Sequence, residues 1–215
     1  MSVYTDSYFT MLGCDFTYNK ANTTSVLNVV GSSSVYNNTI YACNFEYNSA
    51  LMNTLSLMYS KTNITKCSFS KNTATERTKN LFIGFSNVSI TSTTFKESTL
   101  ASPATTAATD ATQGSFLFLI MDVYLYLDTV SFYNGISAQG GAVYLSGQSS
   151  VYFARASFDN NYSGSKGGAI YASGYSHLEF SECSFTRNYA AAEGDDIYSA
   201  NSEKVLNISG TSITN

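Results

Sequence analysis

The chain has 215 residues, a net charge of −4, and aromatic residues at 14%. Its 11 basic residues are scattered and form no basic stripe, which argues against a nucleic-acid partner. The longest apolar stretch, residues 116–121, is too short to cross a bilayer, so we expect no membrane-spanning segment. The many Val, Ile, Thr, Tyr and Phe residues favour strands over helices.

One short pattern recurs along the chain: a phenylalanine with an asparagine three positions later. The copies are Phe16 with Asn19, Phe45 with Asn48, Phe69 with Asn72, Phe158 with Asn161, and Phe185 with Asn188. Phe132 with Asn134 is a copy shortened by one residue, and Phe95 is a degenerate copy with Ser98 in place of the asparagine. A spacing near 26 residues indicates one supersecondary unit stacked on itself.

The period is interrupted once, after Phe95, by residues 98–114. This segment is small and polar and contains the only proline, so we expect a surface loop there. Beyond it, a Gly-Gly or Gly-Asp pair leads to an aliphatic residue and a tyrosine at Gly140, Gly167 and Gly194, 27 residues apart each time. A further apolar segment follows each, at residues 151–153, 178–180 and 205–208. Each unit therefore offers three short strands.

Three strands in about 26 residues leave no room for a helix, and a propeller blade needs about 40 residues. We therefore predict an all-β fold, a parallel β-helix of about seven to eight coils forming a single domain over residues 1–215. Alternation supports it, with Val143 inside, Tyr144 outside, and Glu179 outside. The N-terminus shows no signal peptide, and the repeat phase favours a segment of a longer secreted chain over a cytosolic protein.

Stacked coils place equivalent residues above one another. We expect the phenylalanines to fill one interior wall by ring stacking. The asparagines should form an amide ladder at a turn, each side-chain carbonyl accepting from the next amide. The predicted structural ladder comprises Phe16, Phe45, Phe69, Phe95, Phe132, Phe158, Phe185, Asn19, Asn48, Asn72, Asn161 and Asn188.

Each of the four cysteines, Cys14, Cys43, Cys67 and Cys183, lies two residues before a phenylalanine of the repeat. Their spacing is therefore that of the repeat and does not match a zinc motif. Cys14, Cys43 and Cys67 lie on adjacent coils. A column of small buried thiols is the favoured interpretation, with a disulfide between neighbouring coils as the alternative and metal binding as a third.

Acceptor sequences for N-linked glycans are as numerous as composition alone would give. Asn161 belongs to the ladder and should be buried, so we expect its acceptor sequence to stay unmodified. The glycosylation candidates in a secreted protein are Asn22, Asn37, Asn63, Asn87 and Asn207.

No catalytic constellation stands out. His177 is the only histidine, and alternation with Leu178 turns it toward solvent. Asp195 and Asp196 are adjacent in a strand-like segment and should face opposite ways. The glycine pairs are not followed by a helix, so they do not form a phosphate-binding loop. We expect no catalytic residue, no metal and no cofactor.

The Phe-x-x-Asn and Gly-Gly-Ala-aliphatic elements of residues 132–198 resemble the repeats of chlamydial polymorphic outer-membrane proteins. They also resemble large repeat-rich surface proteins of ciliates and other protists. The resemblance implies a right-handed parallel β-helix of the pectin-lyase-like kind, an extracellular or cell-surface location, and a role as a surface passenger or adhesin. The membrane-anchoring parts of such proteins do not occur in this chain.

The sequence thus favours a non-enzymatic structural or adhesive β-helix. Exposed strand edges recruit other chains, so its partners would be itself or further coils of the same chain end to end, glycans, or surface proteins. A polysaccharide lyase or glycoside hydrolase on the same fold is the alternative, marked by three or more acidic residues, or Arg with Asp, on one outer face. Ice binding would need repeated threonine rows, and Thr91, Thr93 and Thr94 are too few.

Overall fold

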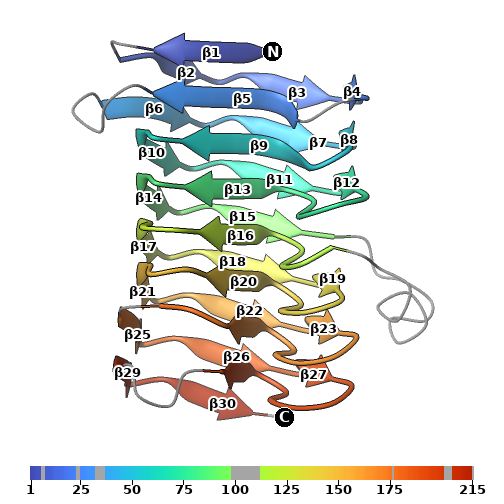
Figure 1. Ribbon diagram of the computed structural model, residues 1–215, viewed down its shortest axis with the longest axis vertical. Coiled ribbons are helices and arrows are strands. Elements are labelled where there is room, and N and C mark those ends of the chain that lie inside the picture. The colour runs from blue at the N-terminus through green and yellow to red at the C-terminus, as the bar shows by residue number, and fades with distance from the viewer. Residues whose placement is uncertain are drawn as a thin grey trace.

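The computed structural model describes residues 1–5, 8–22, 25–31, 37–97, 112–175, 177–200 and 205–214. These residues form strands and turns and no helix, wound into a stack of coils with the N-terminus at one end and the C-terminus at the other (Figure 1). Three parallel sheets of eight strands each run the length of the stack. The predicted parallel β-helix is therefore confirmed.

Each coil contributes one strand to each of the three sheets, which we name after their first strands. The β1 sheet contains β1 (Ser2–Thr5), β5 (Ser25–Gly31), β9 (Asn53–Met58), β13 (Leu81–Gly84), β16 (Leu117–Ile120), β20 (Val143–Ser146), β24 (Ile170–Ala172) and β28 (Ile197–Ser199). The β2 sheet contains β2 (Thr10–Leu12), β6 (Asn37–Tyr41), β10 (Lys61–Thr65), β14 (Asn87–Thr91), β17 (Tyr124–Asp128), β21 (Ser150–Ala154), β25 (His177–Ser181) and β29 (Val205–Ser209). The β3 sheet contains β3 (Asp15–Thr17), β7 (Asn44–Glu46), β11 (Ser68–Ser70), β15 (Thr94–Lys96), β18 (Ser131–Tyr133), β22 (Ser157–Asp159), β26 (Ser184–Thr186) and β30 (Ser212–Thr214).

Six described coils also have a fourth, two-residue strand just after the β3 sheet. These strands form two small parallel sheets, β4 (Lys20–Ala21), β8 (Ser49–Ala50) and β12 (Thr73–Ala74), and β19 (Ile136–Ser137), β23 (Tyr162–Ser163) and β27 (Tyr189–Ala190). The sequence indicated only three strands per unit. The fourth is too short to show an alternating pattern, and pairing with the neighbouring coils is what makes it extended.

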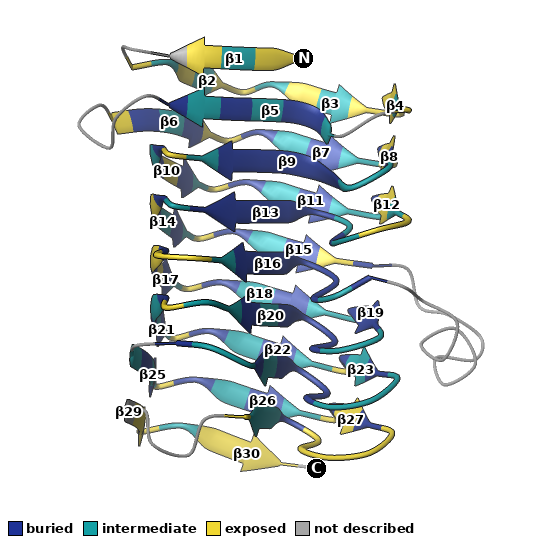
Figure 2. Ribbon diagram, in the orientation of Figure 1, coloured by how far each residue is buried: buried dark blue, intermediate teal, exposed yellow. Residues whose placement is uncertain are grey.

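The core lies inside the spiral, where the inward side chains of the three sheets meet (Figure 2). Alternation assigns the faces as predicted: Val143 is fully buried and Tyr144 is not, and Glu179 is partly exposed between two buried neighbours. The register then places like residues on like residues, for example Phe132 opposite Phe158 and Ile64 opposite Ile90. Each inward side chain is thus covered by the equivalent side chains of the coils on either side.

The corner between the β2 and β3 sheets has the same backbone conformation in every coil. The residue three positions before each ladder phenylalanine, or before Ile213 in the last coil, has φ between 49° and 57°: Gly13, Ala42, Lys66, Ser92, Thr129, Arg155, Glu182 and Gly210. A left-handed residue other than glycine costs about 1–2 kcal/mol. The conformation persists because the backbone N–H of the left-handed residue donates to a carbonyl of the next coil, as the Ala42 N–H does to the Thr65 carbonyl at 2.9 Å.

The paired glycines have two separate roles. The first takes a positive φ, 63° at Gly140 and 68° at Gly167. The second has no such φ, but a Cβ at Gly141 would collide with the Gly168 carbonyl oxygen of the next coil. The second glycine is therefore required by the close approach of adjacent corners.

The expected loop of residues 98–114 lies mostly outside the described residues, which resume at Thr112. Thr112 is 1% exposed, and Gln113 pairs with Gln139 of the next coil. Gly114 has φ of 60° and donates its N–H to the Gln139 carbonyl at 2.9 Å. These three residues belong to a coil corner and are not part of a surface loop.

Candidate functional site

The ladder phenylalanines form one continuous stack through the β3 sheet. Neighbouring rings lie 4.6 to 5.2 Å apart between centroids, with interplanar angles of 2° to 12°. From Phe45 to Phe185 every ring is fully buried, and Ile213 takes the next place. The spacing of the coils sets the ring separation, which suits stacking of aromatic rings.

The ladder asparagines line the turn that follows the β3 sheet. The backbone N–H and side-chain amide of Asn48 donate to Asn72 Oδ1 at 2.9 and 3.0 Å, and the same amide donates to the Phe16 carbonyl at 2.7 Å. Asn161 is bonded to Asn188 Oδ1 in the same way, at 3.0 and 2.9 Å. Each carboxamide therefore ties three successive coils together while it is buried.

Where the next ladder asparagine is missing, a polar residue eight positions further on accepts instead. The amide of Asn72 donates to Asn80 Oδ1 at 2.7 Å, and Asn188 donates to Asp196 Oδ1 at 2.9 Å. Asn134, taken from the sequence as a shortened copy, lies at the corner one position earlier. The ladder position of that coil is Gly135, whose N–H donates to Asn161 Oδ1 at 2.9 Å.

The cysteine thiols form hydrogen bonds with backbone groups at the corner that precedes a ladder phenylalanine. The Cys43 N–H donates to Cys67 Sγ at 3.4 Å, and that thiol donates to the Thr65 carbonyl at 3.4 Å. Thr93 makes the same two bonds in the next coil, at 3.3 and 2.9 Å. The position thus requires a small side chain that both donates and accepts, which thiol and hydroxyl groups share.

All four cysteines are free thiols, and Cys43, Cys67 and Cys183 are buried. Burial raises the pKa of the Cys67 thiol to about 11 and also raises the pKa of Cys43 and Cys183. Because the thiolate is the form that attacks or binds metal, these thiols are poorly reactive. The described residues hold no group of three or more His, Cys, Asp or Glu side chains that could bind a metal ion.

The outer face of the β1 sheet carries a second aromatic stack. It runs through Phe82, Phe118, Tyr144, Tyr171 and Tyr198, with centroids 4.9 to 5.6 Å apart. Burial and the neighbouring phenols raise the pKa of Tyr171. Partial burial of this stack means that it is not an open aromatic surface.

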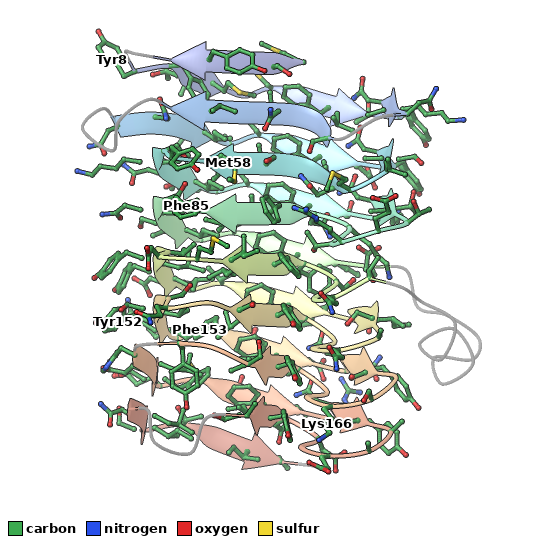
Figure 3. The ribbon with its side chains drawn as sticks, in the orientation of Figure 1. Tyr8, Met58, Phe85, Tyr152, Phe153 and Lys166 are labelled. Atoms are coloured by element: carbon green, nitrogen blue, oxygen red, sulfur yellow. The ribbon has the colours of Figure 1, made fainter. Side chains whose placement is uncertain are left out.

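Cations cover both ends of this outer stack. The Arg77 guanidinium lies 4.8 Å from the centre of the Phe82 ring, and Lys166 Nζ lies 4.3 Å from that of Tyr198 (Figure 3). Lys166 also donates to the Tyr198 hydroxyl at 3.0 Å and pairs with Glu193 at 3.1 Å. Both contacts are cation–π interactions, in which the face of the ring attracts the cation. They fix the corner loops against the β1 sheet.

The outer face of the β2 sheet is open and holds the only histidine. His177 Nε2 lies 2.9 Å from a Glu179 carboxylate oxygen, and its ring lies 4.8 Å from that of Tyr152. Tyr152 points out of the stack, whereas its neighbour Phe153 points into it (Figure 3). The histidine is therefore outward, as predicted, and lies on a flat surface.

Two Arg–Asp pairs link neighbouring coils at the surface. Arg155 pairs with Asp128, and Arg187 Nη2 lies 2.6 Å from Asp159 Oδ2. The sequence marked the enzymatic alternative by three or more acidic residues, or Arg with Asp, on one outer face, and each of these pairs brings a single Arg beside a single Asp. The two arginines instead occupy different corners of the coil, one before and one after the β3 sheet. Solvent screens exposed pairs of this kind, so they contribute little to stability.

Asp195 and Asp196 face opposite ways, as the sequence indicated. Asp195 is exposed, and its Oδ1 accepts the Ala190 N–H at 3.0 Å. Asp196 is 7% exposed and completes the asparagine ladder by accepting from Asn188. Both carboxylates therefore have a structural partner in the last corner, and they do not form an acid–base pair.

Sequence reasoning missed two features. A glycine corner lies at Gly114, 26 residues before Gly140, and this spacing was available in the sequence. The left-handed corners at Lys66, Thr129 and Arg155 left no signal, because these residue types are not typical of that conformation.

Residues 155–173 match the model of the Chlamydia polymorphic membrane protein repeat. The matched segment runs from the Arg155 corner through β22 and β23 to β24, and it includes Phe158, Asn161 and Gly167. The chain is therefore similar to those repeats in the part where ladder, corner and glycine pair occur together. No curated protein and no solved structure matches the chain. Within the described ranges, no helix is long and apolar enough to cross a membrane.

Proposed function

We propose that this protein is a non-enzymatic structural and adhesive β-helix of an extracellular or cell-surface protein. The observation that carries the proposal is the unbroken Phe stack through the β3 sheet, which joins all the coils into one continuous rod. The match to a repeat of a membrane protein family supports a location at the cell surface. The outer face of the β3 sheet then binds glycans or surface proteins.

The polysaccharide-cleaving alternative is tested directly. Purified protein incubated with acidic and neutral polysaccharides should release neither reducing ends nor unsaturated sugars. Turnover that Glu179→Gln abolishes would contradict the proposal, because Glu179 is the carboxylate that accompanies the only histidine. The matched control is Asp159→Asn, which removes a partly buried carboxylate, paired with Arg187, at another corner.

The two ends of the stack support self-association. A hollow of about 400 Å³ at the C-terminal end is lined by Ile197, Leu206, Ile208 and Ile213, whose apolar side chains are partly or largely exposed. Strand edges that carry unpaired N–H and C=O groups pair readily with another chain.

We propose that a second copy docks on this end and continues the spiral. The register of the β2 sheet places Met11 of the first coil in the same column as Ile208 of the last. Phe16 and Ile213 share a column of the β3 sheet in the same way. A second copy would therefore bury apolar residues on apolar residues, and such a head-to-tail contact leads to open filaments.

Sedimentation velocity and electron microscopy test this assembly. The unmodified protein should form oligomers that lengthen with concentration, and Ile208→Lys should stay monomeric. Asn207→Lys, on the outer side of the same strand, should assemble as the parent does. Met11→Lys blocks the other end, so a mixture of Met11→Lys with Ile208→Lys should stop at dimers. A monomeric parent at high concentration without filaments would overturn the assembly.

A further inference from the structure

The outer face of the β2 sheet contains four asparagines, and all of them begin an Asn-x-Ser/Thr sequence. They are Asn37 in β6, Asn63 in β10, Asn87 in β14 and Asn207 in β29. All four are exposed, and none of their amides bonds another residue in the described part of the chain. Among the other 15 asparagines of the sequence, only Asn22 and Asn161 begin such a sequence.

The strand conformation explains why both parts of each sequence lie on one side. Residues two positions apart share a face of a strand, so the hydroxyl of Thr65 stands on the same surface as the Asn63 amide. The register also aligns the coils: Asn63 lies opposite Thr39 on one side and Ser89 on the other, and these belong to the neighbouring acceptor sequences. Three successive coils thus present one continuous acceptor surface.

Asn161 is the internal contrast. Its side chain is 1% exposed, and its amide donates to the Phe132 carbonyl at 3.2 Å and to Asn188 Oδ1 at 2.9 Å. An amide bonded to a sugar has one proton left and cannot make both bonds. A chain modified at Asn161 would lose this rung of the ladder.

We propose that the outer face of the β2 sheet is a glycosylated surface, with N-linked oligosaccharides at Asn37, Asn63, Asn87 and Asn207 and none at Asn161. The inference rests on the proposed extracellular location. The donor is an oligosaccharide bound through its anomeric carbon to a polyprenyl diphosphate, supplied by the secretory pathway. The Asn Nδ2 loses a proton and bonds the anomeric carbon, while the bond from that carbon to the diphosphate oxygen breaks and the diphosphate leaves with the electron pair.

The coil geometry sets the density of the sugars. Asn37 and Asn87 occupy one column two coils apart, about 10 Å at the spacing of parallel strands. Asn63 lies on the coil between them and two residues along, about 8 Å from each. Sugars this close cover the β2 face of the first coils, so lateral contacts of the rod must use its other faces.

Glycopeptide mapping of the protein isolated from its own cells tests the inference. Enzymatic removal of N-glycans in ¹⁸O-labelled water converts each modified asparagine to labelled aspartate, which mass spectrometry reads site by site. We expect label at the four face positions and none at Asn161. Asn63→Gln should remove one glycan, and Thr65→Ser, which keeps the acceptor sequence, should leave the glycan number unchanged.

Surface proteolysis of intact cells, run in parallel, separates this inference from the proposed function. Protein that is cleaved at the cell surface but carries no label at the four positions overturns the glycosylated face and leaves the structural role intact. Unlabelled protein that is protected inside the cell overturns both. Label at Asn161 in folded, protease-resistant protein also refutes the inference, because the ladder would then tolerate a sugar.

Discussion

Replacing Asn72 by leucine should test the amide ladder at its best-bonded rung. Asn72 is fully buried and makes four hydrogen bonds: it accepts the N–H and amide of Asn48, and it donates to the Phe45 carbonyl at 2.9 Å and to Asn80 Oδ1 at 2.7 Å. Leucine has a similar size and can make none of them.

The cost follows from the partners left behind. The amide of Asn48 keeps its bond to the Phe16 carbonyl, and Asn80 keeps the bonds that its own amide donates. Three groups lose the bond that Asn72 made to them: the Asn48 N–H, Asn80 Oδ1 and the Phe45 carbonyl. Each buried polar group without a partner costs about 1–3 kcal/mol, so Asn72→Leu should lower the free energy of unfolding by about 3–5 kcal/mol.

Urea-induced unfolding followed by far-UV circular dichroism measures this difference. The matched control is Asn63→Leu, because Asn63 is exposed on the β2 face and its amide bonds no other described residue. A surface substitution of this kind should change stability by at most about 0.5 kcal/mol. Equal losses in the two variants would refute the ladder as a source of stability.

Two further substitutions test the corners. Thr129 is β-branched and has φ of 56°, so Thr129→Gly should raise the free energy of unfolding by about 0.5–1 kcal/mol. The control Thr94→Gly, within β15, should lower the free energy of unfolding. A lower free energy of unfolding in both variants would show that the corner is unstrained. The pKa of the Cys67 thiol is raised to about 11 from 9.0, so its contribution to stability is complete below pH 9 and is lost as the pH rises through 11. We therefore compare the parent with Cys67→Thr, which has at this position the residue type of Thr93. Between pH 9 and 11 the free energy of unfolding, measured in urea, should fall by roughly 2–3 kcal/mol less in Cys67→Thr than in the parent. Identical pH profiles of the two proteins would contradict a buried thiol.

The repeat in the sequence was sufficient to predict the fold. Residues that recur every 26 or so positions, such as Phe132, Phe158 and Phe185, have equivalent surroundings only if the chain winds so that they superimpose. The direction of Tyr144 and Glu179 also followed from alternation, because strand side chains point to opposite faces in turn.

The details of the corners could not be predicted in this way. Nothing in the residue types of Lys66 or Arg155 indicates a left-handed backbone, because the inter-coil hydrogen bonds impose that conformation on whichever residue is there. That Gly135 and not Asn134 occupies the ladder position of its coil likewise depends on which backbone N–H faces Asn161.

The sequence by itself determined the winding of the chain and the composition of its inner columns, since both follow from a local period. Only the tertiary structure decided which distant residues share an outer surface. Asn37, Asn63 and Asn87 are separate motifs along the chain, and they come together because the parallel register holds their strands side by side at one spacing of the coil.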